Sequence, residues 1–219
     1  MPIAKHLSPE AVRHSGAAPF VFVGERLWLD FVNSDDATNA RGDAGIDALD
    51  TFDGFVGWLT AARILDAERA TAMLRRAQQQ PTGSGAALHE AIRLRTVLRA
   101  LAERGEAPQE RATQAAIAEI NRILGRSAGT RRVEPRSDGG FVRNFMTAGD
   151  VFAGLVIPMV ESAADALVGG ELNRVRRCAD RRCSRVFYDG SRNGKRRWCD
   201  MKTCGNRAKA ARHRKRAGS

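Results

Sequence analysis

The sequence has no apolar stretch long enough to cross a bilayer, because the longest, Val151 to Val160, contains only ten residues. Its first 19 residues lack the basic-then-apolar order of a signal peptide. Both absences argue against the membrane-anchored and exported classes of protein. We therefore expect a cytoplasmic protein without membrane contact.

Catalytic groupings are also missing. Histidine is scarce, with four residues in 219. His6, His14 and His89 are scattered along the chain, and no acid–base or nucleophilic constellation emerges from them. We expect a protein that is not an enzyme; the alternative left open is a pocket enzyme that uses Arg95.

Cysteine is absent from the first 177 residues, and the four that follow have a regular spacing. Four residues separate Cys178 from Cys183 and Cys199 from Cys204, and fifteen lie between the two pairs. In a reducing cytoplasm, clustered cysteines bind metal more often than they form disulfides. The spacing predicts a closed tetrahedral site for one structural Zn²⁺, with two disulfides or four free buried thiols as the alternatives. Few apolar residues surround these cysteines, so the metal must supply most of the local stability.

Charge is concentrated in the same part of the chain. The formal net charge is +11, from 36 basic and 25 acidic residues. Residues 174–219 contain 17 basic and 3 acidic residues, which leaves the remainder close to neutral. Such asymmetry favours a polyanion partner, most often nucleic acid, over a tail that only solubilises the protein.

The expected fold class is α+β: a mainly helical N-terminal domain with short β-hairpins, then a small four-cysteine zinc module that ends in a basic helix. β-rich runs at 20–23 and 27–32 predict one hairpin, and residues 131–145 predict a second that turns at 138–140. Apolar residues at helical spacing predict helices over 47–62, 66–79, 86–103, 109–124 and 150–168. Within the zinc module, short strands are expected at 175–177 and 185–188.

Glycine and proline indicate where these elements end. Residues 80–85 (QPTGSG) should break the helical pattern, and Pro158 should kink the apolar helix in which it lies. Gly169 and Gly170 should end that helix and begin the joint to the zinc module.

The segment after Cys204 is rich in alanine, arginine and lysine, which favour helix. A basic helix held at one end by zinc can enter a major groove or lie along phosphates, whereas a tail that never orders is the alternative. The candidate nucleic-acid contacts are Arg192, Lys195, Arg196 and Arg197 in a basic loop, and Lys209, Arg212, His213, Arg214 and Arg216 on the helix.

One arginine interrupts an apolar helical face. Arg95 falls inside the apolar arc of the helix predicted over 86–103. A buried guanidinium needs an anion, so Arg95 either pairs internally, for example with Asp30, or reaches the rim, or binds a small anionic ligand. In the ligand interpretation, Asn33 provides a second polar contact.

The segment from Ser191 to Lys209 resembles the CGNR zinc finger, whose name stands here as Cys204, Gly205, Asn206 and Arg207. The runs Leu29–Asn33 (LDFVN) and Phe55–Leu59 (FVGWL) resemble the ABATE domain, which usually precedes this finger in bacterial proteins. The resemblance implies zinc ligation by Cys178, Cys183, Cys199 and Cys204. It also implies that Trp198 packs on the finger and that Arg207 contacts phosphate.

The same resemblance implies a stress-induced transcriptional regulator. Its expected parts are a leader over 1–19, an ABATE-like ligand-sensing domain over 20–170 and a DNA-binding CGNR finger over 171–219. We expect double-stranded DNA as the partner, association with the nucleoid and a homodimer joined through the helical body. The alternative is an RNA-binding or ribosome-associated zinc protein.

Overall fold

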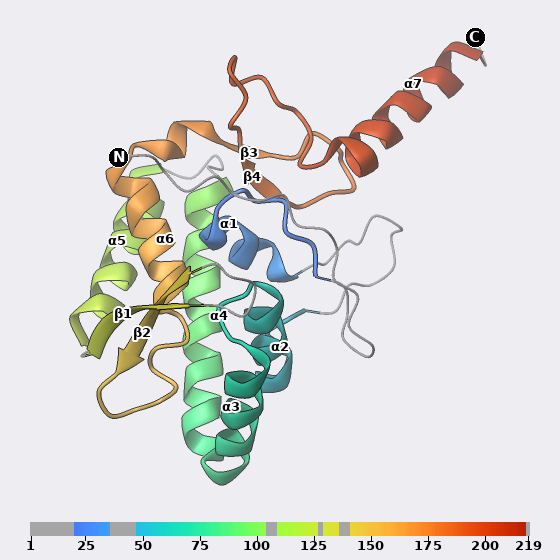
Figure 1. Ribbon diagram of the computed structural model, residues 1–219. Coiled ribbons are helices and arrows are strands. Elements are labelled where there is room, and N and C mark those ends of the chain that lie inside the picture. Colours follow the sequence, from blue (N-terminus) through green and yellow to red (C-terminus); the bar gives the residue numbers. More distant parts are fainter. Residues whose placement is uncertain (1–19, 36–46, 104–108, 127–128, 136–140, 218–219) are drawn as a thin grey trace.

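The structure, a computed structural model, describes residues 20–35, 47–103, 109–126, 129–135 and 141–217 (Figure 1). The predicted leader over 1–19 lies outside these residues. None of the described helices is long and apolar enough to span a membrane. The observed architecture is mainly helical, with two small two-stranded sheets, and so agrees with the α+β prediction.

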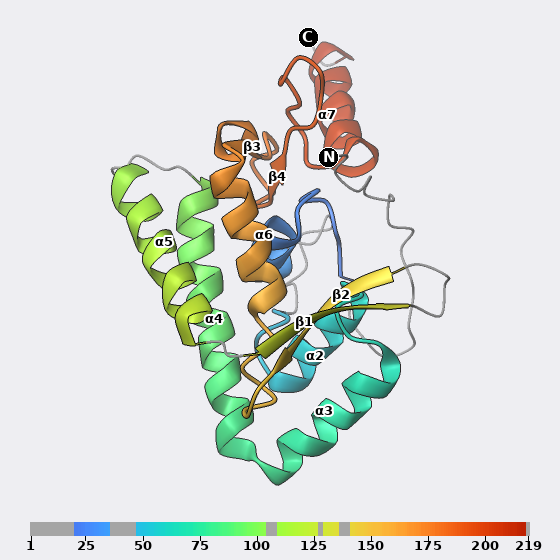
Figure 2. The same cartoon turned by 60° about the vertical axis from the view of Figure 1, so that its left-hand side comes forward.

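Helices form the larger part of the molecule. In chain order they are α1 (Leu27–Val32), α2 (Phe52–Ala61), α3 (Ala67–Gln79), α4 (Pro81–Glu103), α5 (Gln109–Arg126) and α6 (Ile157–Val168), with a short 3₁₀ turn η1 (Asn33–Asp35) after α1. The long α4 contacts α1, α2, α3 and α5, and α1 also contacts α6 (Figures 1 and 2). An antiparallel hairpin of β1 (Gly129–Pro135) and β2 (Phe141–Thr147) joins α5 to the segment before α6.

The C-terminal part is small and differently built. A 3₁₀ turn, η2 (Glu171–Arg174), leads into the antiparallel pair β3 (Val175–Arg177) and β4 (Val186–Tyr188). A π-helical turn, η3 (Met201–Gly205), then runs directly into α7 (Asn206–Ala217). Both strands agree with the sequence prediction, as does the closing basic helix.

The hairpin predicted over 20–32 is wrong, because Leu27–Val32 forms α1. Trp28, Leu29, Phe31 and Val32 are all fully buried. A half-buried strand of a hairpin hides only every second residue, whereas a short central helix can hide consecutive ones. The β propensity of the run is therefore overridden by burial on all sides.

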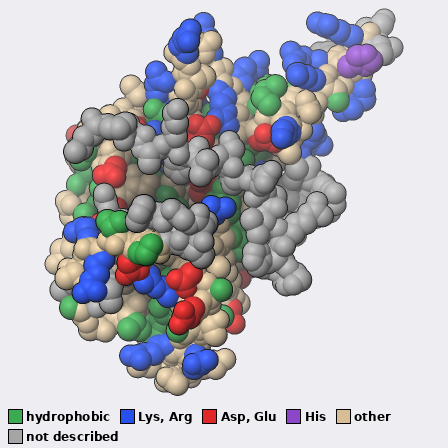
Figure 3. All heavy atoms as spheres, viewed as in Figure 1, with side chains coloured by type: hydrophobic (Ala, Val, Ile, Leu, Met, Phe, Trp, Pro, Cys, Tyr) green, Lys and Arg blue, Asp and Glu red, His purple; other side chains and the backbone are tan. Residues whose placement is uncertain are grey.

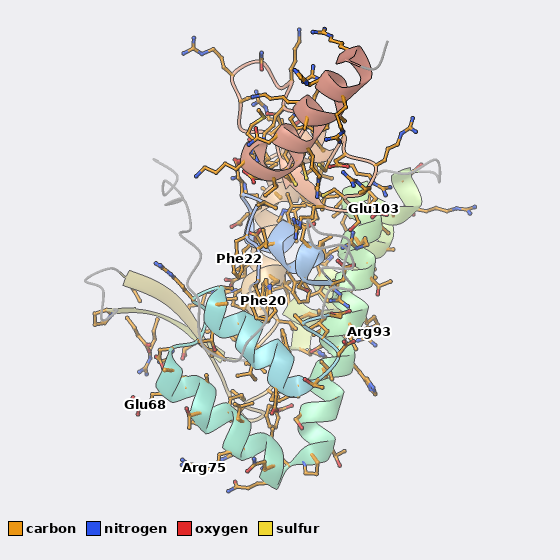
Figure 4. All side chains as sticks on the ribbon, turned by 90° about the vertical axis from the view of Figure 1, so that its right-hand side faces the viewer. Phe20, Phe22, Glu68, Arg75, Arg93 and Glu103 are labelled. Carbon is orange, nitrogen blue, oxygen red and sulfur yellow. The ribbon has the colours of Figure 1, made fainter. Side chains whose placement is uncertain are left out.

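Aromatic side chains join α1 to its neighbours in the core. Phe31 packs edge-on against Trp58 of α2, with ring centroids 5.4 Å apart. Phe22 lies 6.0 Å from the same indole, and Figure 4 shows Phe20 and Phe22 beside α2. The buried core extends past the helices to Val175 and Val186 of the β3–β4 pair. The C-terminal part therefore shares its core with the helical body.

Helix boundaries differ from the predicted ones where proline and capping residues decide them. Thr51 accepts a hydrogen bond from the Gly54 N–H at 3.0 Å, so α2 begins at Phe52 and not at residue 47. α4 begins at Pro81, so the expected break over 80–85 is confined to Gln80. Pro158 lies in the first turn of α6 and does not kink it, because the missing N–H is not needed there. Gly169 ends that helix, as expected.

Gly24 can be replaced by no larger residue without moving backbone. A Cβ atom at Gly24 would lie 2.7 Å from the Asp30 nitrogen and 2.8 Å from the Leu29 Cβ. We expect Gly24→Ala to lower the free energy of unfolding by about 1–3 kcal/mol. Gly85→Ala is the matched control: in α4 nothing lies within 4 Å of its Cβ. It should raise stability by roughly 0.5–1 kcal/mol. Urea unfolding of both variants measures this, and equal effects would contradict the packing argument.

Candidate metal centre and nucleic-acid interface

The four cysteines converge on one point. Their sulfur atoms all lie within 4.8 Å of one another, and all four residues are buried. The Sγ of Cys199 is 3.7 Å from that of Cys183 and 3.7 Å from that of Cys204. A tetrahedron with Zn–S bonds of about 2.3 Å has sulfur–sulfur edges of about 3.8 Å, whereas a disulfide needs about 2.05 Å. The geometry therefore fits one structural Zn²⁺ held by four thiolates.

Backbone hydrogen bonds shape the first cysteine pair. The Cys178 N–H donates to the Arg185 carbonyl at 2.9 Å, and the Cys183 N–H donates to the Asp180 carbonyl at 2.9 Å. The next N–H, of Ala179, donates to the Arg197 carbonyl at 2.8 Å and so ties the two cysteine-bearing segments together. These bonds turn the chain tightly enough to place both sulfurs on one side.

Asp200 shapes the second pair. Its carboxylate accepts the N–H groups of Lys202 at 3.2 Å and Thr203 at 3.0 Å, and the Thr203 hydroxyl at 2.9 Å. This capping starts η3 at Met201, two residues after Cys199. The π-helical turn brings Cys204 back towards Cys199 before α7 begins.

The signature residues after Cys204 each serve the metal site. A Cβ at Gly205 would lie 2.7 Å from the Met201 sulfur and 3.3 Å from the Trp198 ring, so a larger residue would have to displace both side chains. The Asn206 amide donates to the Lys202 carbonyl at 3.0 Å. Arg207 donates to the Asp180 carboxylate at 2.8 Å and to the Cys204 sulfur at 3.0 Å. Such a contact to a ligand atom orients the ligand and stabilises its negative charge.

The sulfur cluster has a small apolar cover. Phe187 is fully buried against the four cysteines, and Trp198 and Val23 pack on it from outside. The packing role implied for Trp198 agrees with this contact. Hydrogen bonding with the neighbouring Cys178 and Cys183 thiols, together with burial, raises the pKa of the Cys199 thiol. A divalent cation supplies the positive charge that lets such crowded thiolates coexist.

The metal site is attached to the helical body along β4. The Asn33 side chain, at the end of α1, donates to the Val186 carbonyl at 2.8 Å and accepts the Val186 N–H at 2.9 Å. The Tyr188 N–H donates to the Gly24 carbonyl at 2.9 Å. One edge of β4 therefore pairs with β3, and the other edge pairs with the body.

Two arginines reinforce this attachment. Arg26 donates twice to the Glu171 carboxylate, at 2.7 Å each, and lies 3.8 Å above the Tyr188 ring. Arg196 pairs with the Glu25 carboxylate and donates to the Trp198 carbonyl at 2.9 Å and to the Cys199 carbonyl. The attachment thus reaches from the body to a metal ligand.

The structure gives protein partners to both residues of the ligand interpretation. Asn33 is occupied by Val186, and Arg95 makes a double ion pair with Asp47 at 2.5 Å and donates to the Ser34 hydroxyl at 3.1 Å. Asp47, not Asp30, is therefore the internal partner. Partial burial would raise the pKa of Asp47, but the Arg95 guanidinium holds it below its ordinary value. Both side chains are thus engaged within the protein, and ligand binding there stays a prediction.

The predicted nucleic-acid contacts divide into two groups. Arg196 and Arg207 are engaged with Glu25, Asp180 and the metal-ligand segments. The exposed members form no ion pair within the described part of the chain; they are Arg192, Lys195, Arg197, Lys209, Arg212, His213, Arg214 and Arg216. Figure 3 shows basic side chains gathered on α7 and on the loop beside it, whereas both signs mix over the body.

Comparison with known families agrees with this geometry. Residues 25–170 match the family model ABATE, described as "Putative stress-induced transcription regulator", and residues 174–217 match the model CGNR zinc finger. The chain belongs to the ABATE family and carries a CGNR zinc finger. A search among curated proteins finds no significant relative. We call residues 25–170 the ABATE body and residues 174–217 the CGNR finger.

The CGNR finger exposes four further cations that the sequence analysis did not select. Arg177, Arg181, Arg182 and Lys202 are all exposed beside the cysteine pairs. Arg181 and Arg182 lie within the first spacer, between Cys178 and Cys183. In a tight turn around a metal, side chains that are not ligands point outward. Basic residues between two paired cysteines are therefore a sequence signal for exposed cations, and this signal could have identified Arg181 and Arg182.

We expect one zinc ion per chain, and its removal should unfold the CGNR finger because few apolar residues hold it. Cys199→Ser should lose the metal, whereas Lys202→Ala, an exposed change in η3, should retain it. Elemental analysis of the reduced protein and hydrogen exchange of residues 175–217 measure both effects. Sulfurs joined in disulfides, or a chelated protein with full protection of the finger, would contradict the site.

Asp30 makes the stability of the folded protein depend on pH. Burial raises the pKa of Asp30 to about 7, although the Gly24 N–H, which donates to its carboxylate at 2.7 Å, and the Val23 N–H lower it. The folded state then binds this proton more tightly than the unfolded state, so stability falls as pH rises from about 4 through 7. Relative to Asp30→Asn, the parent should lose about 2 kcal/mol between pH 5 and 7. Urea unfolding at several pH values measures the difference, and a constant difference would contradict it.

Proposed function

We propose that the protein is a transcriptional regulator whose CGNR finger binds double-stranded DNA. The main support for this proposal is α7, a cationic helix that begins at the metal site and extends away from the ABATE body (Figures 1 and 2). Its 12 residues make a rod about 18 Å long, which fits a major groove. The description of the ABATE family as a transcription regulator supports the same function.

The two sides of α7 have different tasks. Arg207 faces the metal site, and Arg214, seven residues later, follows on the same side of the helix. Lys209, Arg212 and Arg216 follow one another at intervals of three and four residues and share the opposite side. These three cations are exposed on the side away from the metal site, so they are the residues we assign to DNA. Arg214 is also exposed, but it follows on the side of Arg207.

The basic loop and the first cysteine spacer supply the flanking contacts. Asp189 is fully buried, and its carboxylate accepts the Ser191 N–H at 3.0 Å and the Arg196 N–H at 2.9 Å. Both ends of the loop are therefore fixed, and Arg192 and Lys195 between them remain exposed. With Arg181 and Arg182, they can bind phosphates beside the helix and set its register on the duplex.

A single finger of this size reaches few base pairs. We therefore include in the proposal that two copies of the chain bind one DNA site, as symmetric regulators do. Control by a small ligand at the ABATE body, and association with the nucleoid, complete the proposed regulator.

Paired alanine variants test the helix assignment. Arg212→Ala should weaken DNA binding about tenfold and lower the slope of log K against log salt by about 1, because one outward cation is lost. Arg214→Ala removes the same charge two residues away, on the side of Arg207, and should have a much smaller effect. Fluorescence anisotropy with genomic duplexes at several salt concentrations measures both, and sedimentation gives the number of chains per duplex.

Three results would overturn this proposal. Equal effects of the two variants would reduce α7 to a nonspecific cationic tail. Undiminished duplex binding after zinc chelation would remove the finger from the interaction. Preference for structured RNA over duplex DNA at fixed salt would favour the RNA-binding alternative.

A further inference from the structure

A chain of contacts runs from the ABATE body into the zinc site. It begins at Glu25, two residues before α1, and passes through Arg196 of the finger. The Arg196 guanidinium pairs with Glu25 and donates to the carbonyl of Cys199, one of the four metal ligands. One side chain, that of Arg196, thus connects a residue of the body to a metal-ligating cysteine of the finger.

Arg196 is held from several directions. It also donates to the Trp198 carbonyl at 2.9 Å, and it lies 4.6 Å above the ring of Phe187, which packs on the sulfur cluster. Arg196 therefore fixes the backbone just before and at Cys199. Glu25 supplies the negative charge that fixes the guanidinium.

The backbone at Glu25 is unusual. Its φ is +59°, in the left-handed region that non-glycine residues seldom occupy. Neighbouring Gly24 is pressed against Asp30 and Leu29, and its carbonyl accepts the Tyr188 N–H. A strained residue whose side chain contacts a distant functional segment points to a role beyond local packing.

A second contact joins the C-terminal end of α1 to the finger segment that follows Cys183. Asn33 closes α1 and pairs with both backbone groups of Val186, and the Cys178 N–H donates to Arg185, the residue before Val186. The two ends of α1 thus contact the two segments that carry the metal ligands. Helix α1 itself is buried in the body core.

We propose that Glu25 and Asn33 of the ABATE body are outer positioning residues of the zinc site. The body thereby sets the zinc affinity of the finger, and bound zinc in turn stabilises α1. Removing a group that contacts a metal ligand directly commonly lowers metal affinity 10–100-fold, and Glu25, which acts through Arg196, should have an effect at the lower end of this range. Coupling of this kind is reciprocal, so zinc must protect α1 to the extent that the body strengthens zinc binding. The proposal does not depend on DNA binding.

The first test compares two carboxylate variants of the full chain. Glu25→Gln should weaken zinc binding about tenfold in competition with a chromophoric chelator. Glu171→Gln removes the carboxylate that pairs with Arg26. Arg26 lies over the Tyr188 ring and donates to the Glu25 carbonyl, but within the described part of the chain none of its hydrogen bonds, ion pairs or ring contacts reaches one of the four cysteines. The zinc affinity of Glu171→Gln should stay within about twofold of the parent. Equal losses in the two variants would mean that general weakening of the joint, not positioning, lowers the affinity.

A further variant separates positioning from folding. Glu25→Gly relieves the backbone strain at φ +59° and also removes the carboxylate. It should be at least as stable to heat as Glu25→Gln, and yet should show the same loss of zinc affinity. Parent-like zinc affinity in Glu25→Gly would overturn the proposal, since it would show that the carboxylate is not needed.

Two readouts test the route through Arg196 and its reciprocity. In an Arg196→Gln background, Glu25→Gln should cause no further loss of zinc affinity, whereas additive losses would contradict the route. Chelation of zinc from the parent should speed hydrogen exchange of the α1 amides, residues 27–32. Equal hydrogen-exchange rates of the α1 amides with and without zinc would overturn the coupling, whatever the DNA experiments show.

Discussion

The closure of four thiolates around one divalent cation is the constraint on which the C-terminal part depends. Between residues 174 and 217 only Phe187, Tyr188, Trp198 and a few aliphatic side chains are available for a core. So little apolar surface cannot offset the chain entropy lost on folding. The sulfur cluster sets where η3 and α7 begin, because Cys204, Gly205, Asn206 and Arg207 follow one another without a linker. The direction in which the cationic helix leaves the protein is therefore fixed at the metal.

The finger nevertheless does not stand alone. Its strand β4 has one edge against β3 and the other against the start and end of α1, and Val175 and Val186 belong to the core of the body. A flexible tether would let the basic surface reorient freely, whereas this joint holds it at one angle to the helices. A shift of α1 in the ABATE body would therefore disturb the hydrogen bonds that hold β4. The ABATE body and the CGNR finger share one core.

The four residues that name the finger also acquire a physical meaning. The family resemblance places Arg207 at phosphate, but in the structure this side chain holds Asp180 and the Cys204 sulfur. Arg196 likewise faces inward. Net charge predicts that a polyanion binds somewhere on this lobe, but it does not tell which cations are free. That distinction depends on whether a carboxylate or a ligand sulfur lies within reach, which only the folded chain decides.

The sequence alone determined the zinc ligands, the basic helix, the short strands of the finger and most of the body helices, because each depends on spacing or periodicity within a short segment. It did not determine that Leu27–Val32 is a helix, that Asp47 pairs with Arg95, or that Asn33 pairs with Val186. These depend on partners distant in the sequence, the last of them 153 residues apart. Local sequence patterns indicate which secondary structure a segment favours and which of its faces is apolar. Whether a segment is buried on all sides, and which partner a polar group finds, is decided only when distant segments pack together.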